Sequence, residues 1–374
     1  MRDPRHEKLA AVLVGYSVAV KKDDLVRISG SPAASALIIE IYRKVLEAGG
    51  HPFVRMAPDD LQEVFLKTAS PEQLQYISPL AKFEVETIDC SIGLWAEQNT
   101  RALTNCDPER MRISAAARRP ISEIFLKRAA EGKLRWVGTQ FPTNASAQDA
   151  EMSLAEYEDF VFAAGHLDKP DPVACWKRIS EQQQRLVDYL QGRRDLRIVA
   201  ANGTDLRMSV AGRRWINCDG HENFPDGEVF TGPVLDSVEG TIRFSFPAVH
   251  HGREVLDVRL TFRSGRVVDA SAAKGEDYLL KMLDTDEGSR LVGEIAFGCN
   301  YQIRRYTKNT LFDEKIGGTM HLALGAGYPE TGNDNRSGLH WDMVVDLRDG
   351  GYVELDGEKI NIDGVFRRDG FPTA

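Results

Sequence analysis

The chain has 374 residues, of which 42% are hydrophobic and 28% charged, and its formal net charge is -9. This composition is typical of a globular protein, and the length favours two domains over one hydrophobic core. The negative charge argues against a surface that binds nucleic acid or anionic membranes, and no long run of Lys or Arg suggests otherwise. No apolar stretch approaches the roughly 20 residues that a membrane-spanning helix needs.

The cysteines and the N-terminus indicate a cytoplasmic protein. The five cysteines are widely spaced and include no Cys-x-x-Cys pair, which fits neither a disulfide framework nor a thiolate zinc site. Near the N-terminus, Glu7 and Lys8 precede a short apolar run, and no cleavage pattern follows it. This segment predicts a first amphipathic helix rather than a signal peptide. We therefore expect no membrane and no nucleic-acid partner.

The first half of the sequence alternates between strand and helix patterns. The run LVRIS at residues 25–29 predicts a strand that ends at Gly30. Ser31 is a suitable N-cap and Pro32 a suitable first helical residue, and the helix that follows should end at Gly49–Gly50. With the run PFVRM behind it, this is a βαβ unit whose strands should be parallel. Further elements are predicted in the same order, with helices at 61–79, 107–131, 152–165 and 172–191 and strands within 83–97 and 134–143.

The second half is dominated by short strands with alternating polarity, beginning near Leu196. One helix, roughly Glu276–Thr285, interrupts them. Ser–Gly and Asp–Gly pairs typical of hairpin turns recur at Ser264–Gly265, Asp349–Gly350, Asp356–Gly357 and Asp363–Gly364. We therefore predict an α/β N-terminal domain with a mostly parallel sheet at residues 1–190. An α+β C-terminal domain rich in antiparallel strands should follow at residues 191–374.

Two histidines of the second half lie in strand patterns. In the run LHWDMVVDL, His340 and Asp342 alternate with apolar residues and so point to one face of a strand. Such a nitrogen–oxygen pair suits a metal ion, although a His–Asp hydrogen bond on a half-buried sheet would look the same. His321 lies in the apolar run GGTMHLALG, where a buried structural histidine is the alternative. A glycine-rich turn with Tyr328 then leads to His340.

Two glutamates extend this set. Glu228 begins the β-favouring run of NFPDGEVFTGP, and Glu294 lies within the apolar run LVGEIAFGCN. Taken singly, Glu228 suits an ordinary turn and Glu294 an edge position facing water. A buried carboxylate, however, is costly unless a cation or another partner neutralises it. His221 precedes Glu228 closely and would border a site there. The candidate metal ligands are therefore Glu228, Glu294, His321, His340 and Asp342.

With these residues in view, the chain resembles the M29 metallopeptidases, the aminopeptidase T and aminopeptidase S group, over nearly its whole length. The likeness is strongest in NFPDGEVFTGP, LDTDEGSRLVGEIAFGCN, FDEKIGGTMHLALGAGYPETG, SGLHWDMVVDLRDGG and VELDGEKINIDGVF. In the first half it extends to QNTRALTNCDPER and TQFPTNASAQDAEMSLAEYEDF. The resemblance implies a homodimer with its catalytic centre in the C-terminal domain. It also implies that the family's five metal ligands fall on the five candidates above, with Tyr328 at the site.

Five ligands, three of them carboxylates, exceed the needs of one tetrahedral zinc and suit two divalent ions about 3.5–4 Å apart. Zinc, cobalt and manganese are the candidates. The implied activity is hydrolysis of N-terminal residues from peptides with a free N-terminus, through a metal-bridged water. Tyr328 would bind a metal or stabilise the oxyanion, and Glu228 or Glu294 would alternate between ligand and base.

Two alternatives remain open. The superfamily includes mononuclear non-haem iron dioxygenases that cleave dihydroxypyridine rings and resemble the 2-His-1-carboxylate pattern. The presence of both Glu228 and Glu294 favours the peptidase over these enzymes. A non-catalytic metal-binding homologue would be expected to lose ligands, whereas this chain retains the full set.

Overall fold

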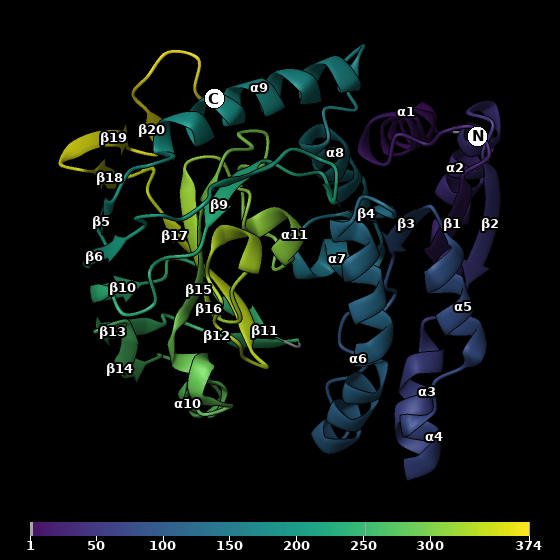
Figure 1. Ribbon diagram of the computed structural model, residues 1–374, viewed down its shortest axis with the longest axis horizontal. Coiled ribbons are helices and arrows are strands. Elements are labelled where there is room, and N and C mark those ends of the chain that lie inside the picture. The colour runs from purple at the N-terminus through teal and green to yellow at the C-terminus, as the bar shows by residue number, and fades with distance from the viewer. Residues whose placement is uncertain (1–2, 251, 374) are drawn as a thin grey trace. The chain divides into compact units, whose positions relative to one another are not determined.

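The computed structural model describes residues 3–250 and 252–373, and the chain divides into two compact units (Figure 1). The first unit extends to Val173 and includes the later segment Gly220–Pro225. The second unit comprises Ala174–Asp219 and the chain from Asp226 onward. A domain boundary near residue 190 stays a prediction, and these units differ from it in placing most of the preceding helix with the second unit.

The first unit is built on a five-stranded sheet in the order β2-β1-β3-β4-β8, and each pair of neighbouring strands is parallel. The predicted parallel α/β domain is therefore confirmed. The strands are β1 (Leu25–Gly30), β2 (His51–Met56), β3 (Cys90–Trp95), β4 (Arg135–Gln140) and β8 (Asn223–Phe224).

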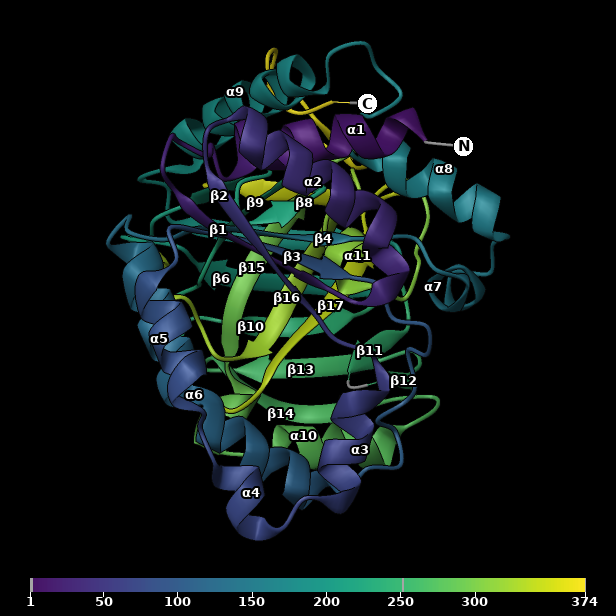
Figure 2. The ribbon, with the colours of Figure 1, turned by 90° about the vertical axis from the view of Figure 1, so that its right-hand side faces the viewer.

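The predicted βαβ unit is also confirmed. The Ser31 hydroxyl accepts a hydrogen bond from the Ala33 amide at 3.3 Å, and Pro32 begins a short 3-10 turn before helix α2 (Ser35–Glu47). The chain leaves this helix through Gly49, whose φ of 81° lies in the left-handed region that glycine adopts without strain. Helix α1 (Pro4–Val12), predicted at the N-terminus, packs beside α2 (Figure 2).

The single helix predicted at residues 61–79 is wrong. The segment forms helices α3 (Asp60–Thr68) and α4 (Pro71–Gln75), and a third helix, α5 (Pro79–Thr87), begins at its end. Each break falls at a Ser–Pro pair, because a residue before proline is driven to extended backbone while proline suits the first helical turn. These helices pack along α6 (Pro108–Ala130) (Figure 1). The remaining helices of this half are α7 (Asn144–Asp149), α8 (Leu154–Ala164) and α9 (Pro172–Leu190).

The second unit contains two antiparallel sheets and a small hairpin, which confirms the predicted antiparallel α+β character. The larger sheet has eight strands: β5 (Asp195–Ala200), β6 (Thr204–Ser209), β10 (Glu239–Arg243), β13 (Arg259–Arg263), β14 (Arg266–Ser271), β18 (Tyr352–Leu355), β19 (Glu358–Ile362) and β20 (Val365–Phe366). The other sheet, here called the site sheet, has the order β17-β16-β15-β9-β7. Its strands are β7 (Ile216–Cys218), β9 (Glu228–Thr231), β15 (Val292–Gly298), β16 (Thr319–Gly325) and β17 (His340–Asp346).

Three of the four predicted hairpin turns are confirmed, at Ser264–Gly265, Asp356–Gly357 and Asp363–Gly364. The hairpin predicted at Asp349–Gly350 is wrong, because the chain there passes from β17 in the site sheet to β18 in the eight-stranded sheet. At Asp356–Gly357 the φ angles are 49° and 84°, and at Asp363–Gly364 they are 51° and 73°. Positive φ at both central residues is the signature of the type I′ turn, which matches the twist of a hairpin. The unit is completed by the hairpin of β11 (Ala248–His250) and β12 (Arg253–Val255) and by helices α10 (Glu276–Leu283) and α11 (Thr310–Asp313).

One apolar core joins the two sheets of the second unit. It includes Leu196 and Ile198 from the eight-stranded sheet and Ile295, Phe297 and Leu322 from the site sheet. Because strand side chains alternate between faces, the residues between these core positions on the site sheet point to its other face. Within the described residues, no helix combines the length and the apolar character needed to cross a membrane.

Candidate metal centre

The five predicted ligands lie on the face of the site sheet that points away from the apolar core. On β15, Ile295 and Phe297 face the core, so Glu294 faces the opposite way. The same alternation applies on the neighbouring strands. It brings together Glu228 from β9, His321 from β16, and His340 and Asp342 from β17.

The strand register brings Glu294 and Asp342 together. Glu294 is paired with Ala323, and Ala323 is paired in turn with Asp342 on the far strand. Because the residue between the two acids carries only a methyl group, both carboxylates have room to extend over it. The neighbouring pair Ala296–His321 repeats this arrangement of a small residue beside a ligand.

The side chains converge closely. His321 Nε2 lies 3.3 Å from Glu294 Oε1 and 3.9 Å from Asp342 Oδ1. His340 Nε2 lies 3.6 Å from Glu294 Oε2 and 3.4 Å from Asp342 Oδ1. His321 and Glu294 are only 1% and 4% exposed, whereas the His340 side chain is 31% exposed, so the cluster is shielded from bulk water at His321 and Glu294 and open at His340. We call these four residues the histidine end of the centre.

In each histidine, Nε2 faces the carboxylates and the other ring nitrogen, Nδ1, forms a hydrogen bond with a backbone carbonyl. The Nδ1–H of His321 donates to the Glu314 carbonyl at 3.1 Å, and that of His340 donates to the Ala326 carbonyl at 2.9 Å. Carbonyl oxygens only accept, so Nδ1 keeps its proton and Nε2 is directed at the carboxylates. Metal-binding histidines are usually oriented in this way.

Neighbouring charges shift the pKa values of the ligand side chains. Burial alone would lower the pKa of His321, but its hydrogen bond to Glu294 and the nearby carboxylates raise that pKa to about 10. Burial is likewise outweighed at His340, where Asp342 raises the pKa to about 10. Burial alone would raise the pKa of Asp342, yet His340 lowers it to about 2. The carboxylates thus stabilise positive charge next to them.

Two buried carboxylate oxygens indicate that a cation fits. Among the described residues, neither Glu228 Oε2 nor Asp342 Oδ1 accepts a hydrogen bond of good geometry, although each lies within 4 Å of a histidine nitrogen: His321 for Glu228, and His340 and His321 for Asp342. Leaving anionic oxygens buried without a donor is costly, and burial raises the pKa of Glu228 accordingly. Nitrogen and carboxylate donors of this kind are the ligands that zinc and similar divalent ions take in proteins. The residues present therefore fit the group that the sequence implied.

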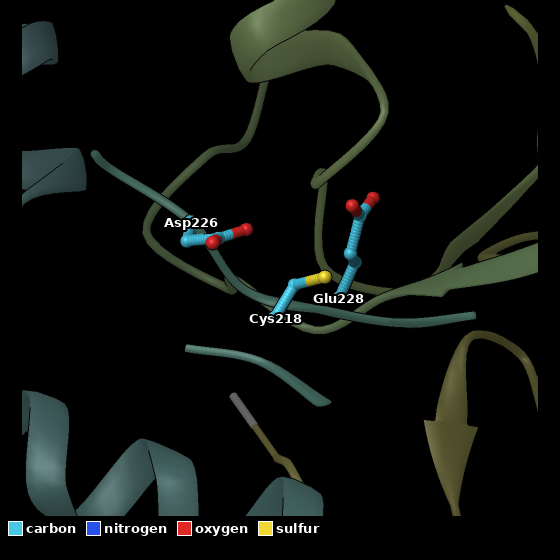
Figure 3. Close-up of side chains that lie close together, drawn as sticks. All are labelled: Cys218, Asp226 and Glu228. Atoms are coloured by element: carbon cyan, nitrogen blue, oxygen red, sulfur yellow. The ribbon is translucent and has the colours of Figure 1, made fainter. Parts of the chain in front are cut away.

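Three charged residues at this centre were missed from the sequence. Lys315 Nζ lies 3.7 Å from Glu228 Oε1 and 3.9 Å from Asp226 Oδ1, and it also contacts the Glu314 carboxylate. Figure 3 shows Asp226 and Glu228 in the same chain segment, with the side chain of Cys218 beside them. The available signal was the charged triplet DEK between the apolar residues of LFDEKIGG, which precedes His321. We call Asp226, Glu228, Glu314 and Lys315 the Glu228 end of the centre.

Tyr328 and His221 occupy different surroundings. The Tyr328 ring packs edge-on against Phe230 and His340, with centroids 5.2 and 5.5 Å apart, and it remains 39% exposed. Partial desolvation and the nearby carboxylates of Glu294 and Asp342 raise the pKa of Tyr328 far above the ordinary value. His221 belongs to the first unit, where its ring lies 4.7 Å from that of Tyr16.

Buried amides hold the loop between Tyr328 and His340. Asn333 Nδ2 donates to the carbonyls of Pro233 and Val292, at 3.2 and 3.1 Å. Asn335 Nδ2 donates to the Gly325 carbonyl at 2.6 Å. Because these side chains replace backbone pairing inside the unit, the glycine-rich loop has a fixed path into the ligand strand β17.

Asp286 forms hydrogen bonds with the end of the same loop, just before His340. Its carboxylate accepts hydrogen bonds from the Gly338 amide at 2.6 Å, the Ser337 hydroxyl at 2.7 Å and the Gly288 amide at 3.0 Å. Burial alone would raise the pKa of Asp286, but these donors lower it.

Replacing Asp286 by Asn is expected to lower the free energy of unfolding by at most about 1 kcal/mol at neutral pH, because the charged acceptor is lost but solvent screens a charge at this exposed position. A carboxyl whose folded pKa is lowered stabilises above its unfolded pKa of about 3.9 and loses that effect as pH falls through the folded value. The difference should therefore shrink below about pH 4. Urea unfolding of both proteins at several pH values measures it, with Asp369→Asn as an exposed control. A difference that stays constant with pH would contradict this account.

The fold and the cluster together define a metalloenzyme with a buried site of imidazoles and carboxylates on an antiparallel sheet. Residues 2–364 match the family described as thermophilic metalloprotease (M29). The chain belongs to this M29 family and is thus a metal-dependent peptidase. One relative, Aminopeptidase 2 from Geobacillus stearothermophilus, is 28% identical over 96% of this chain and 93% of its own length.

Two solved structures share the fold. AmpT from Thermus thermophilus aligns with a TM-score of 0.85 at 24% identity, over 98% of this chain and 99% of that one. The 2,5-dihydroxypyridine dioxygenase of Pseudomonas putida KT2440 aligns with a TM-score of 0.61 at 11% identity, over 98% of both chains. At these identities the likenesses establish architecture alone, and the second is clearly the more distant.

Proposed function

We propose that this chain is a metal-dependent aminopeptidase that hydrolyses the N-terminal residue from peptides with a free amino terminus. One observation carries the proposal: His321 and His340 each give Nδ1–H to a backbone carbonyl and direct Nε2 at Glu294 and Asp342. Membership of the M29 family supports it, as does a full-length relative named as an aminopeptidase.

The proposed cofactors are two divalent ions, with zinc, cobalt and manganese as candidates. The residues that would hold them are Glu228, Glu294, His321, His340 and Asp342. Ions bound there would polarise the scissile carbonyl and promote ionisation of the attacking water. Glu228 and Glu294 take part in catalysis as the buried negative charges that keep this positive charge in place.

Glu314 is the best proton acceptor for the attacking water. Its carboxylate belongs to the buried group that it forms with Glu228 and His321. Burial raises the pKa of Glu314, which brings a carboxylate closer to the range that suits a base near neutral pH. Its backbone carbonyl also orients His321, so the base and one ligand are positioned by the same residue. Glu228 and Glu294 are then free to remain ligands.

Tyr328 is proposed to donate a hydrogen bond to the oxyanion that forms at the scissile carbonyl. Its raised pKa keeps the phenol protonated, as a donor must be. The ring stands beside His340 while part of it stays exposed, so a substrate can reach it.

The number of carboxylates at the site favours an aminopeptidase over a mononuclear iron dioxygenase that cleaves aromatic rings. A 2-His-1-carboxylate site would need only His321, His340 and Asp342. Here Glu228 and Glu294 add two further buried charges. The Lys315 ammonium near Glu228 is shared with Asp226 and Glu314, so one ion would leave part of this negative charge uncompensated.

Reporter substrates test the proposed activity. Purified protein should release the reporter from Leu-, Phe- or Arg-amides, lose this activity after chelation and regain it with Co²⁺ or Zn²⁺. The matched N-acetylated substrate should resist cleavage, because an aminopeptidase requires the free amine. Equal cleavage of both substrates, activity that survives chelation, or a single bound iron without amidase activity would each refute the proposal.

We further propose that the protein forms a homodimer and is located in the cytoplasm. In the first unit, α2 and the edge strand β2 expose the apolar side chains Ile39, Tyr42, Leu46, Val54 and Met56. Exposed apolar groups of this kind are common where proteins associate. Light scattering tests the dimer, since a solution mass equal to the 41.7 kDa of one chain would contradict it. Cell fractionation tests the location.

A further inference from the structure

A fully buried lysine lies at the Glu228 end of the centre. The Lys315 side chain is 0% exposed, and each carboxylate it contacts, those of Glu228, Asp226 and Glu314, belongs to this end. A buried ammonium requires such partners. One of them, Glu228, is also a proposed metal ligand, so the ammonium and an ion would share its oxygens.

Backbone hydrogen bonds hold the chain segment that carries Lys315. The Lys315 carbonyl accepts a hydrogen bond from the Asn300 amide at 3.0 Å, and the Lys315 amide donates to the Phe312 carbonyl at 3.1 Å. The Asn300 side chain in turn donates to the Asp226 carbonyl at 2.9 Å. Asn300 thus connects the segments that carry the lysine and one of its acidic partners. These bonds fix the backbone from which the Lys315 side chain extends, and the ion pairs with Glu228, Asp226 and Glu314 hold the ammonium itself.

The histidine end has no comparable cation. Across residues 3–250 and 252–373, the ion pairs of Glu294 and Asp342 are made with His321 and His340 alone. An imidazole can give up its Nε2 proton and offer a lone pair to a metal ion, whereas an ammonium is a donor only. The two ends of the centre therefore differ in fixed charge.

We propose that Lys315 makes the two metal positions unequal, so that a divalent cation binds tightly at the histidine end and weakly at the Glu228 end. Two physical causes act in the same direction. The ammonium repels a second cation in a buried setting, and it competes for Glu228. The inference rests on the proposed function, because it takes two divalent ions as the complement of the site.

Metal titration of the full chain tests this directly. Metal-stripped protein is titrated with Co²⁺, and bound ions are counted by equilibrium dialysis with elemental analysis. The wild type should bind one Co²⁺ tightly and a second about 100-fold more weakly, as expected for a buried like charge nearby. Lys315→Met should tighten the second ion about 10-fold or more and change the first less than about threefold. Lys281→Met, at an exposed position of α10, should match the wild type.

A double variant is the control for misfolding, because Lys315→Met alone leaves the Asp226 carboxylate buried without the ammonium that neutralises it. Asp226→Asn combined with Lys315→Met removes one charge of each sign, and it too should tighten the second ion. Two ions of equal affinity in the wild type would overturn the inference while the proposed function stands. So would a second ion that is unchanged or weaker in both variants. Absence of Co²⁺ binding in every protein would overturn the proposed function itself.

Discussion

Replacement of Glu294 by Gln is expected to lower kcat/KM for leucine-amide hydrolysis about 10³-fold, which corresponds to about 4 kcal/mol of transition-state stabilisation. The two oxygens of Glu294 face His321 and His340, at 3.3 and 3.6 Å, so this single side chain joins both imidazoles. An amide keeps the shape but removes the negative charge and turns one acceptor into a donor. Amidase kinetics and metal counting on the same preparation measure the effect.

The expected metal content of Glu294→Gln is below two ions per chain, because a donor at the centre of the cluster is lost. Glu287→Gln, an exposed glutamate outside the site, is the matched control and should retain the activity and metal content of the wild type. Full aminopeptidase activity together with two bound ions in Glu294→Gln would refute the metal-site assignment.

Replacement of Glu314 by Gln is expected to lower kcat by about 10²–10⁴-fold, the usual contribution of a positioned acid or base. The backbone carbonyl that orients His321 is unaffected by this change, so metal content and KM should stay close to the wild type. The acid limb of the kcat profile should also disappear, because the variant lacks the carboxyl that must be deprotonated. Steady-state kinetics across pH, with metal counting, test this.

Glu330→Gln, at an exposed position near Tyr328, is the control for a general effect of charge removal. Loss of bound metal in Glu314→Gln would make Glu314 a ligand instead of a proton acceptor. An unchanged kcat would exclude it from the reaction altogether.

Local patterns in the sequence were sufficient to predict the strands that carry the candidate ligands. Alternation in LHWDMVVDL determines that His340 and Asp342 share a face, because a strand reverses its side chains at every residue. The same rule applies to His321, which lies between the core residues Met320 and Leu322, and to Glu294, which precedes the core residue Ile295. The Ser31–Pro32 helix start and the Asp–Gly hairpins were predictable for a similar reason. Each depends on backbone preferences within a few residues.

Contacts between segments that are far apart in the chain could not be predicted from the sequence. The return of Gly220–Pro225 to the first unit as β8 has no local signature, since two residues pairing with β4 are too few to form a pattern. The helix predicted at 61–79 failed because the Ser–Pro pairs outweighed its apolar periodicity.

The prediction of a metal site at Glu228, Glu294, His321, His340 and Asp342 came from residue type, position within strands and the resemblance to the M29 family. Only the tertiary structure brought Glu314, Lys315 and Asp226 into contact with that set. The sequence gives the order of the charged residues along the chain. Only folding determines which of them are buried together, so that a negative side chain needs a positive one or a metal ion beside it. In this centre a lysine and two further acids lie beside the predicted ligands because distant segments meet in one water-poor volume.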